Sequence, residues 1–166
     1  MDASTFITLA LACAPRVHVD TARALAQVES GLNPWVIGVV GGALQRQPWS
    51  RAEALATARA LQAQGWNFSV GLAQINVRNF ARLGLTLETA FEPCANLAAL
   101  QIVLTDCFDR AGSSGDGEQR ALRQALSCYY SGNFATGFRH GYVQRVVHAA
   151  TRPKPSVSPT PSKEQS

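Results

Sequence analysis

The chain has 166 residues, of which 46% are hydrophobic and 16% are charged. This length corresponds to one domain, and the apolar content is high enough for a sizeable core, so the composition excludes a globally disordered protein. The net charge is +4, and the arginines before residue 150 are spread singly along the chain. Spread basic residues disfavour a nucleic-acid partner, which requires clustering on one face, but they would suit an anionic polymer.

The first 31 residues predict two helices. An apolar stretch that Asp2 or Ser4 would cap is expected to form a helix ending at Pro15. We prefer this helix to a signal peptide, because no basic residue precedes the apolar stretch. The second helix is predicted to begin with Asp20 as its N-cap and to end just before Gly31, which has the conformational freedom that a helix end requires.

The next segments alternate between loop and helix. Residues 31–49 are expected to be a loop with at most a short hairpin, given their β-branched residues and Gly-Gly pair. Ser50 and Glu53 have the spacing of a capping box and predict a helix that Gly65 ends. Residues 66–76, which read WNFSVGLAQIN, are predicted to be extended.

The second half of the chain is mainly helical. The predicted helices are 77–84, 93–112, which is the longest, 118–132 and 141–150. Pro93 suits the first turn of its helix, and Gly112 suits the end of it. From Thr151 the sequence is rich in Pro and Ser. We therefore predict a mainly α domain at 1–150, with at most one small extended or hairpin segment, and a disordered tail at 151–166.

Four cysteines lack the paired spacing of a zinc site. In a cytosolic protein they would most simply be buried thiols. Cys94 and Cys107 fall on one predicted helix, which would separate them by roughly 20 Å, too far for a disulfide. Of the two remaining connectivities we favour Cys13–Cys94 with Cys107–Cys128, because the second pair would join neighbouring helices across a Gly/Ser turn.

Glu29 is the first residue that suggests chemistry. It follows Leu25 and Val28 at helical spacing, so it projects from the apolar face or its edge. Burial and the negative end of the helix dipole would both raise the pKa of its carboxyl, as a general acid requires. The plainer interpretation is a partly exposed glutamate at a helix end.

Two later stretches add polar and aromatic groups. Residues 66–76 offer Ser69, Gln74 and Asn76 as neutral hydrogen-bonding groups, Trp66 and Phe68 as flat faces, and Gly71 for close approach of a ligand to the backbone. Such groups are typical of sugar recognition, although a tight turn packed into the core would use similar residues. The stretch ALSCYYSGN adds Tyr129 and Tyr130, either of which could orient a carboxyl.

Four motifs in order carry a resemblance: ESGLNP, SVGLAQIN, ALSCYYSGN and YVQRV. The series resembles that of the lytic transglycosylases with a lysozyme-like fold, and most of all the VirB-type transglycosylases of type IV secretion and conjugation systems. CAP, IGVVGG and PCANL fit the same group. The resemblance covers roughly residues 10–147. It implies a lysozyme-like helical domain, no cofactor and no metal.

The resemblance also assigns roles. Glu29 matches the catalytic acid/base, and Tyr129 matches the tyrosine that bonds the catalytic carboxyl. Substrate-binding positions are expected at Ser30, Ser69, Gly71, Leu72, Gln74, Asn76, Tyr129 and Tyr142, with Ile75 in the same motif. Two residues depart from the family pattern: Ala73 stands where methionine is usual, and Tyr130 stands where asparagine is usual.

The implied activity is cleavage of peptidoglycan glycan strands with formation of 1,6-anhydromuramic ends, in the bacterial periplasm, beside other proteins of a secretion apparatus. No acidic residue other than Glu29 lies in the motifs, which fits a route with one carboxylate. The alternatives are a lysozyme-like hydrolase on the same scaffold, a non-catalytic peptidoglycan-binding scaffold protein and, with little support, a nucleic-acid binder. The three histidines are isolated in sequence and suggest no metal site.

Overall fold

The computed structural model describes residues 1–112 and 117–151. The N-terminal elements are α1 (Ala3–Cys13), α2 (Val19–Ser30), β1 (Ile37–Val39), α3 (Arg51–Ala63), β2 (Phe68–Val70) and β3 (Ile75–Asn76). The later elements are η1 (Val77–Asn79), α4 (Phe80–Leu83), α5 (Leu87–Ala90), α6 (Pro93–Gly112), α7 (Glu118–Ser131), α8 (Thr136–Arg139) and α9 (Tyr142–Thr151). The structure is mainly helical, as predicted.

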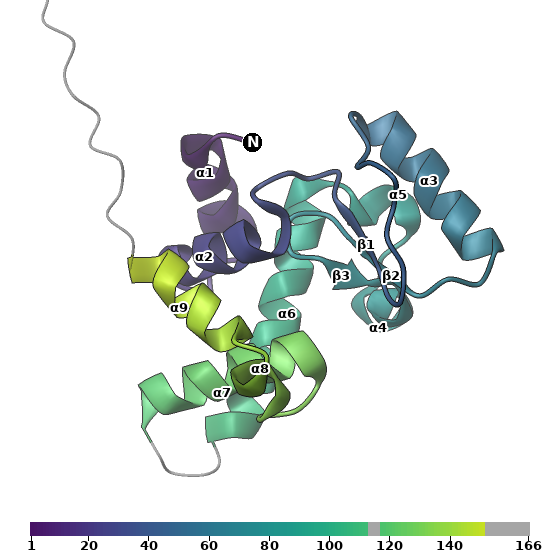
Figure 1. Ribbon diagram of the computed structural model, residues 1–166. Coiled ribbons are helices and arrows are strands. Elements are labelled where there is room, and N and C mark those ends of the chain that lie inside the picture. The colour runs from purple at the N-terminus through teal and green to yellow at the C-terminus, as the bar shows by residue number, and fades with distance from the viewer. Residues whose placement is uncertain (113–116, 152–166) are drawn as a thin grey trace, which may run out of the picture.

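Helix α6 runs through the middle of the molecule (Figure 1). It packs against α1 and α7 on one side and against α5 and β3 on the other. We call α1, α2, α7, α8 and α9 the helical lobe, and β1–β3 with α3, α4 and α5 the sheet lobe. Leu97, Leu100 and Leu104 of α6 are buried, so this helix supplies core to both lobes.

Two disulfides fasten other helices to α6. Cys13 at the end of α1 is joined to Cys94, with their Cα atoms 5.3 Å apart. Cys107 is joined to Cys128 of α7, with a Cα separation of 5.8 Å. This is the connectivity that the sequence favoured.

The helix ends follow local rules, with two departures from the sequence prediction. Asp2 caps α1, and its carboxylate accepts from the backbone N–H of Thr5. Helix α2 is capped by the His18 ring and not by Asp20, which lies inside the first turn. At α3 the hydroxyl of Ser50 accepts from Glu53 N–H as predicted.

The second departure concerns the other half of that capping box. The Glu53 carboxylate accepts from the N–H of Trp49, at 2.8 Å, and not from that of Ser50. The capping box is therefore displaced by one residue. Helices α6 and α7 begin where they were predicted, at Pro93 and Glu118. The predicted disordered tail lies outside the described residues except for Thr151, the last residue of α9.

The sheet is small and antiparallel, with strand order β1-β2-β3. Val70 pairs with Ile37 on one side and with Ile75 on the other. The loop at 31–49 therefore contributes a strand, β1. This strand pairs with β2, which follows α3 in the sequence, and it forms no hairpin within residues 31–49. Strands β2 and β3 form the hairpin, and the turn between them carries residues 71–74.

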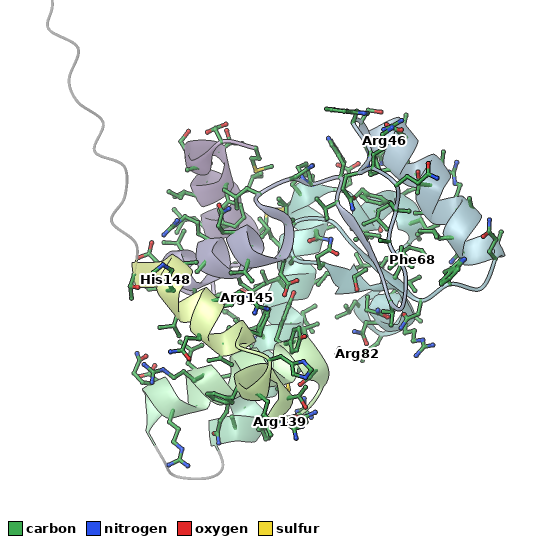
Figure 2. The ribbon with its side chains drawn as sticks, viewed as in Figure 1. Arg46, Phe68, Arg82, Arg139, Arg145 and His148 are labelled. Carbon is green, nitrogen blue, oxygen red and sulfur yellow. A yellow bond between two sulfur atoms is a disulfide. The ribbon has the colours of Figure 1, made fainter. Side chains whose placement is uncertain are left out.

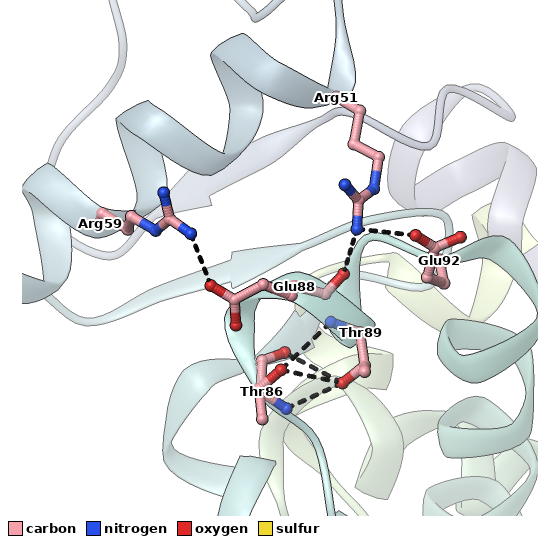
Figure 3. Close-up of polar contacts among 6 residues, drawn as sticks. All are labelled: Arg51, Arg59, Thr86, Glu88, Thr89 and Glu92. Atoms are coloured by element: carbon pink, nitrogen blue, oxygen red, sulfur yellow. Dashed lines mark hydrogen bonds and ion pairs between the residues drawn. The ribbon is translucent and has the colours of Figure 1, made fainter.

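Ion pairs attach α3 to α5 and to the turn that follows α5, at the edge of the sheet lobe (Figure 3). Arg59 pairs with the Glu88 carboxylate at 2.8 Å, and Arg51 pairs with Glu92 at 2.7 Å. The Arg59 guanidinium lowers the pKa of Glu88 to about 2. These exposed pairs orient α3 more than they stabilise the fold.

Among the described residues, no helix is both long and apolar enough to cross a bilayer.

Candidate active site

Glu29 lies in the last turn of α2, half-buried, next to the fully buried Leu25 and Ala26. The helix ends here because Gly31 adopts a left-handed conformation, with φ at +60°. The chain can then turn away sharply, which leaves Glu29 at the junction of the two lobes. This position agrees with the apolar-face placement predicted from its spacing.

The hydroxyl of Tyr142 donates a hydrogen bond to Oε1 of Glu29 at 2.5 Å. Tyr142 is the first residue of α9, which packs against α2, and its side chain is buried. Burial and the nearby Glu29 charge both raise the pKa of this phenol, so it remains a donor. Oε2 of Glu29 has no hydrogen-bond partner among the described residues and is free to exchange a proton.

Burial raises the pKa of Glu29 from 4.5 to about 7. The hydrogen bond from Tyr142 and the positive charge of Arg145 both act in the opposite direction, but they do not cancel the effect of burial. Figure 2 shows Arg145 on the side of α9 that faces the middle of the molecule. A carboxyl that is about half protonated at neutral pH can both give and take a proton.

Glu29 lines a groove between the two lobes with a volume of about 360 Å³. The sheet contributes Val39, Ser69 and Asn76, and helix α7 contributes Tyr129 and Tyr130. Of the described residues that line the groove, Glu29 is the only acidic one. The groove thus combines one perturbed carboxyl with a neutral wall of hydroxyl, amide and aromatic groups.

Four of the predicted binding residues line this groove: Ser69, Gln74, Asn76 and Tyr129. The Asn76 amide donates to the Ser69 hydroxyl at 3.2 Å. Gln74 has a left-handed backbone, with φ at +47°, and its amide nitrogen donates to the carbonyls of Val36 and Gly71. These bonds fix the polar wall in place before any ligand binds, which lowers the entropy cost of recognition.

Gly71, Leu72 and Phe68 do not reach the groove, contrary to the prediction. Leu72 and Phe68 are fully buried in the core. Gly71, at φ +82°, packs against Asn96, and a Cβ here would collide with the Asn96 amide. Glycine is required at 71 by a close approach inside the protein and not by a close approach to a ligand. Ala73 is also fully buried, so its side chain contacts no ligand.

Asn96 is a structural residue of the site that the sequence analysis does not single out. Its side chain accepts from Ala73 N–H at 2.8 Å and donates to the carbonyls of Val70 and Ala90. A lone amide among the apolar residues of α6 was the available signal, since a buried amide must find partners. Asn96 holds the turn that carries Gln74.

The predicted bond between Tyr129 and Glu29 is wrong. Tyr129 lines the groove, but its hydroxyl donates to the Ala73 carbonyl at 2.7 Å. The phenol on Glu29 belongs to Tyr142. The hydroxyl of Ser30, predicted to bind substrate, is 2.8 Å from the Leu72 carbonyl and 3.0 Å from that of Ala26, and it ties the end of α2 to the turn.

A larger hollow of about 650 Å³ lies between α6, α7 and α9. Its wall is mainly apolar, as Phe108, Leu126 and Val146 illustrate, and its acidic residue, Glu118, is exposed. The smaller groove is the better candidate for the active site because it holds the perturbed carboxyl.

No three His, Cys, Asp or Glu side chains gather as a metal site in residues 1–112 and 117–151.

Comparison with known proteins shows the family of the chain. The model of the transglycosylase SLT domain matches residues 7–148, which include the groove and both disulfides. The chain belongs to the transglycosylase SLT family. No solved structure gives a significant match.

This transglycosylase SLT chain is similar to proteins of type IV secretion. It is 52% identical over 151 residues to the type IV secretion system protein virB1 of Brucella abortus, covering 87% of this chain and 63% of the relative. It is 37% identical over 162 residues to the protein virB1 of Agrobacterium fabrum, covering 96% of this chain and 65% of the relative. The chain thus spans a little under two thirds of the length of these relatives.

Proposed function

We propose that the protein is a lytic transglycosylase that cleaves the β-1,4 bond between N-acetylmuramic acid and N-acetylglucosamine. The observation that carries the proposal is Glu29: a half-buried carboxyl with a pKa of about 7, held by the Tyr142 phenol at a groove with neutral polar walls. Family membership supports the reaction class, since the matched family is that of transglycosylases.

In the proposed reaction Glu29 acts first as an acid and then as a base. Its proton passes to the bridging oxygen as the bond from the muramic anomeric carbon to that oxygen breaks, with assistance from the muramic acetamido group. The 6-hydroxyl of the same sugar then bonds to the anomeric carbon, and its proton returns to Glu29. The product is a 1,6-anhydro end, and the route consumes no water and uses no metal or cofactor.

Among the described residues that line the groove, Glu29 has no acidic neighbour, which supports this route. Glycosidases with two carboxylates need the second group within roughly 5–9.5 Å of the first. No acidic side chain besides Glu29 lines the groove within the described part of the chain. Tyr142 fits the cycle because its hydroxyl can stabilise the carboxylate that forms after proton donation.

We further propose that the protein acts on peptidoglycan in the periplasm and opens the wall locally for a type IV secretion or conjugation apparatus. This rests on the similarity to type IV secretion proteins named virB1. Other proteins of the apparatus are its expected partners.

Product analysis tests the proposal. Purified peptidoglycan digested with the protein is expected to yield anhydromuramic ends by mass spectrometry, each lighter by one water than a reducing end. Glu29→Gln keeps the shape but cannot donate a proton, so its activity should fall by at least about a hundredfold. Glu118→Gln, which changes an exposed glutamate at the larger hollow, serves as the matched control and should remain active.

The alternatives predict other results. A lysozyme-like hydrolase would release reducing ends, which also depend on Glu29. A non-catalytic scaffold protein would bind the wall without releasing products, and Glu29→Gln would leave its effect on the wall unchanged. Either result would overturn the proposed reaction.

A further inference from the structure

Two tyrosine rings stack where the groove meets Glu29. The ring of Tyr130 lies 4.5 Å from that of Tyr142, centroid to centroid, at an interplanar angle of 19°. Tyr142 is almost completely buried, whereas Tyr130 is 42% exposed and lines the groove. Tyr130 therefore covers one face of the ring whose hydroxyl donates to Glu29. The nearly parallel arrangement restricts tilting of the Tyr142 ring toward the groove.

Tyr130 is itself anchored. Its hydroxyl lies 3.2 Å from Nδ1 of His140, and the two rings meet edge to face with centroids 5.8 Å apart. The backbone of His140 is fixed on both sides: its N–H donates to the Thr136 carbonyl at 2.9 Å, and its carbonyl accepts from Nη1 of Arg145 at 3.1 Å. With its backbone held in this way, His140 presents its ring to the phenol of Tyr130 and can orient it.

We propose that Tyr130, anchored by His140, is a positioning residue that keeps the Tyr142 hydroxyl on Glu29. The proposal rests on the proposed function and adds a residue to it. Glu29 and Tyr142 are 113 residues apart in sequence and lie on different helices, so their alignment depends on how α9 packs against α2. Side-chain support close to the pair removes the remaining freedom of the ring, and small errors in the position of an acid are costly in rate.

The contacts of Tyr130 explain why a tyrosine can stand at this position. An aromatic ring at 130 can stack on Tyr142, and its hydroxyl reaches a histidine that lies just before α9. These contacts connect helix α7 to the turn at His140 and to helix α9, next to Glu29. The exposed ring of Tyr130 could alternatively serve as a platform for a sugar, which would affect substrate binding and not the chemical step.

The kinetic parameters separate these two roles. With soluble glycan fragments as substrate, Tyr130→Ala is expected to lower kcat about tenfold or more while KM changes by less than about twofold. Tyr130→Phe keeps the stacked ring but loses the bond to His140, so its kcat should fall only a few-fold. Phe138→Ala, which removes an exposed aromatic ring on α8 outside the groove, is the matched control and should leave kcat unchanged.

A double-mutant cycle tests whether Tyr130 acts through Tyr142. Tyr142→Phe abolishes the hydrogen bond to Glu29, so adding Tyr130→Ala to it should lower kcat by no more than about a further twofold. Multiplicative losses in the double variant, or a Tyr130→Ala effect confined to KM, would overturn the inference. Thermal unfolding of each variant checks that the fold is retained.

If Tyr130→Ala does not fold, His140→Ala offers a second test, since it removes only the anchor. It should lower kcat a few-fold with KM unchanged, and unchanged kcat would overturn the anchoring role. Failure of this inference is distinguishable from failure of the proposed function. If Glu29→Gln abolishes activity but Tyr130→Ala is fully active, only the positioning role of Tyr130 is wrong. If Glu29→Gln remains active, the proposed function itself is wrong.

Discussion

Replacing Glu29 by glutamine should make the protein more stable at alkaline pH. The wild-type carboxyl binds its proton more tightly in the folded protein than in the unfolded chain, because burial raises its pKa from 4.5 to about 7. A raised pKa favours the folded state fully below pH 4.5, and this advantage is lost as the pH rises through the window from 4.5 to about 7. Glutamine does not ionise, so the variant loses no stability in that window.

The magnitude follows from the same two values. A tenfold difference in proton affinity corresponds to about 1.4 kcal/mol, so the change from 4.5 to about 7 disfavours the folded carboxylate by about 3 kcal/mol. Between pH 5 and pH 8, the free energy of unfolding of the wild type should fall by about 2 to 3 kcal/mol relative to that of Glu29→Gln. Glutamine can still accept the Tyr142 hydrogen bond, so the two proteins should differ little at pH 5.

Urea denaturation followed by circular dichroism, at pH 5, 6, 7 and 8, measures this difference. Glu118→Gln controls for the loss of one negative charge at an exposed position and should track the wild type at every pH. The disulfides must stay oxidised in all samples, because their reduction would change the unfolded state.

Parallel pH dependences for the wild type and Glu29→Gln would refute the reasoning. That result would mean that Glu29 titrates at the same pH in the folded and unfolded protein, so that burial does not perturb its carboxyl. A Glu29→Gln variant that gains stability only at pH 5 would refute the sign of the argument.

Three further predictions concern the support of the site. Tyr142→Phe removes a hydrogen bond that lowers the pKa of Glu29, so the alkaline limb of the kcat–pH profile should move to higher pH. Asn96→Ala removes three buried hydrogen bonds to the backbone and should lower the free energy of unfolding by roughly 3 to 5 kcal/mol in urea. Replacing Cys13 and Cys94 by alanine opens a link across 81 residues and should cost up to about 4 kcal/mol in the same measurement.

Each of these has a clear contrary result. If the alkaline limb of the kcat–pH profile does not move in Tyr142→Phe, the Tyr142 hydroxyl does not affect the pKa of Glu29. For Asn96→Ala the control is Asn79→Ala at the groove wall, and equal stability of the two variants would deny Asn96 its structural role. A thermal midpoint unchanged after removal of the disulfide would show that α1 needs no link to α6.

Local sequence signals predicted much of the framework. Asp2, Ser50, Pro93 and Gly31 each act at a helix end through their own side chain or backbone conformation, so neighbouring residues suffice to recognise them. The placement of Glu29 on the buried side of α2 follows from helical spacing in the same way. His18 took the cap expected of Asp20 because the helix begins earlier than predicted, at Val19, which places Asp20 inside the first turn, where its own N–H donates to the His18 ring.

Long-range contacts decided the rest. The sequence identified two tyrosine stretches near the site, but it could not show which tyrosine bonds Glu29. The packing of α7 directs the Tyr129 hydroxyl to the Ala73 carbonyl, and the packing of α9 directs the Tyr142 hydroxyl to Glu29. Gly71 is needed because its backbone packs against Asn96 of α6, and Leu72 is needed because it fills the core. Both reasons depend on the packing of α6 against the turn, which the sequence does not show.

The sequence by itself determined a helical domain with one carboxyl at a buried helix end, because spacing, caps and glycines act over a few residues. The tertiary structure decided which phenol holds that carboxyl, how far burial raises its pKa, and which side chains share its groove. Those properties depend on distances between segments as much as 113 residues apart, and such distances are fixed by packing and not by local pattern.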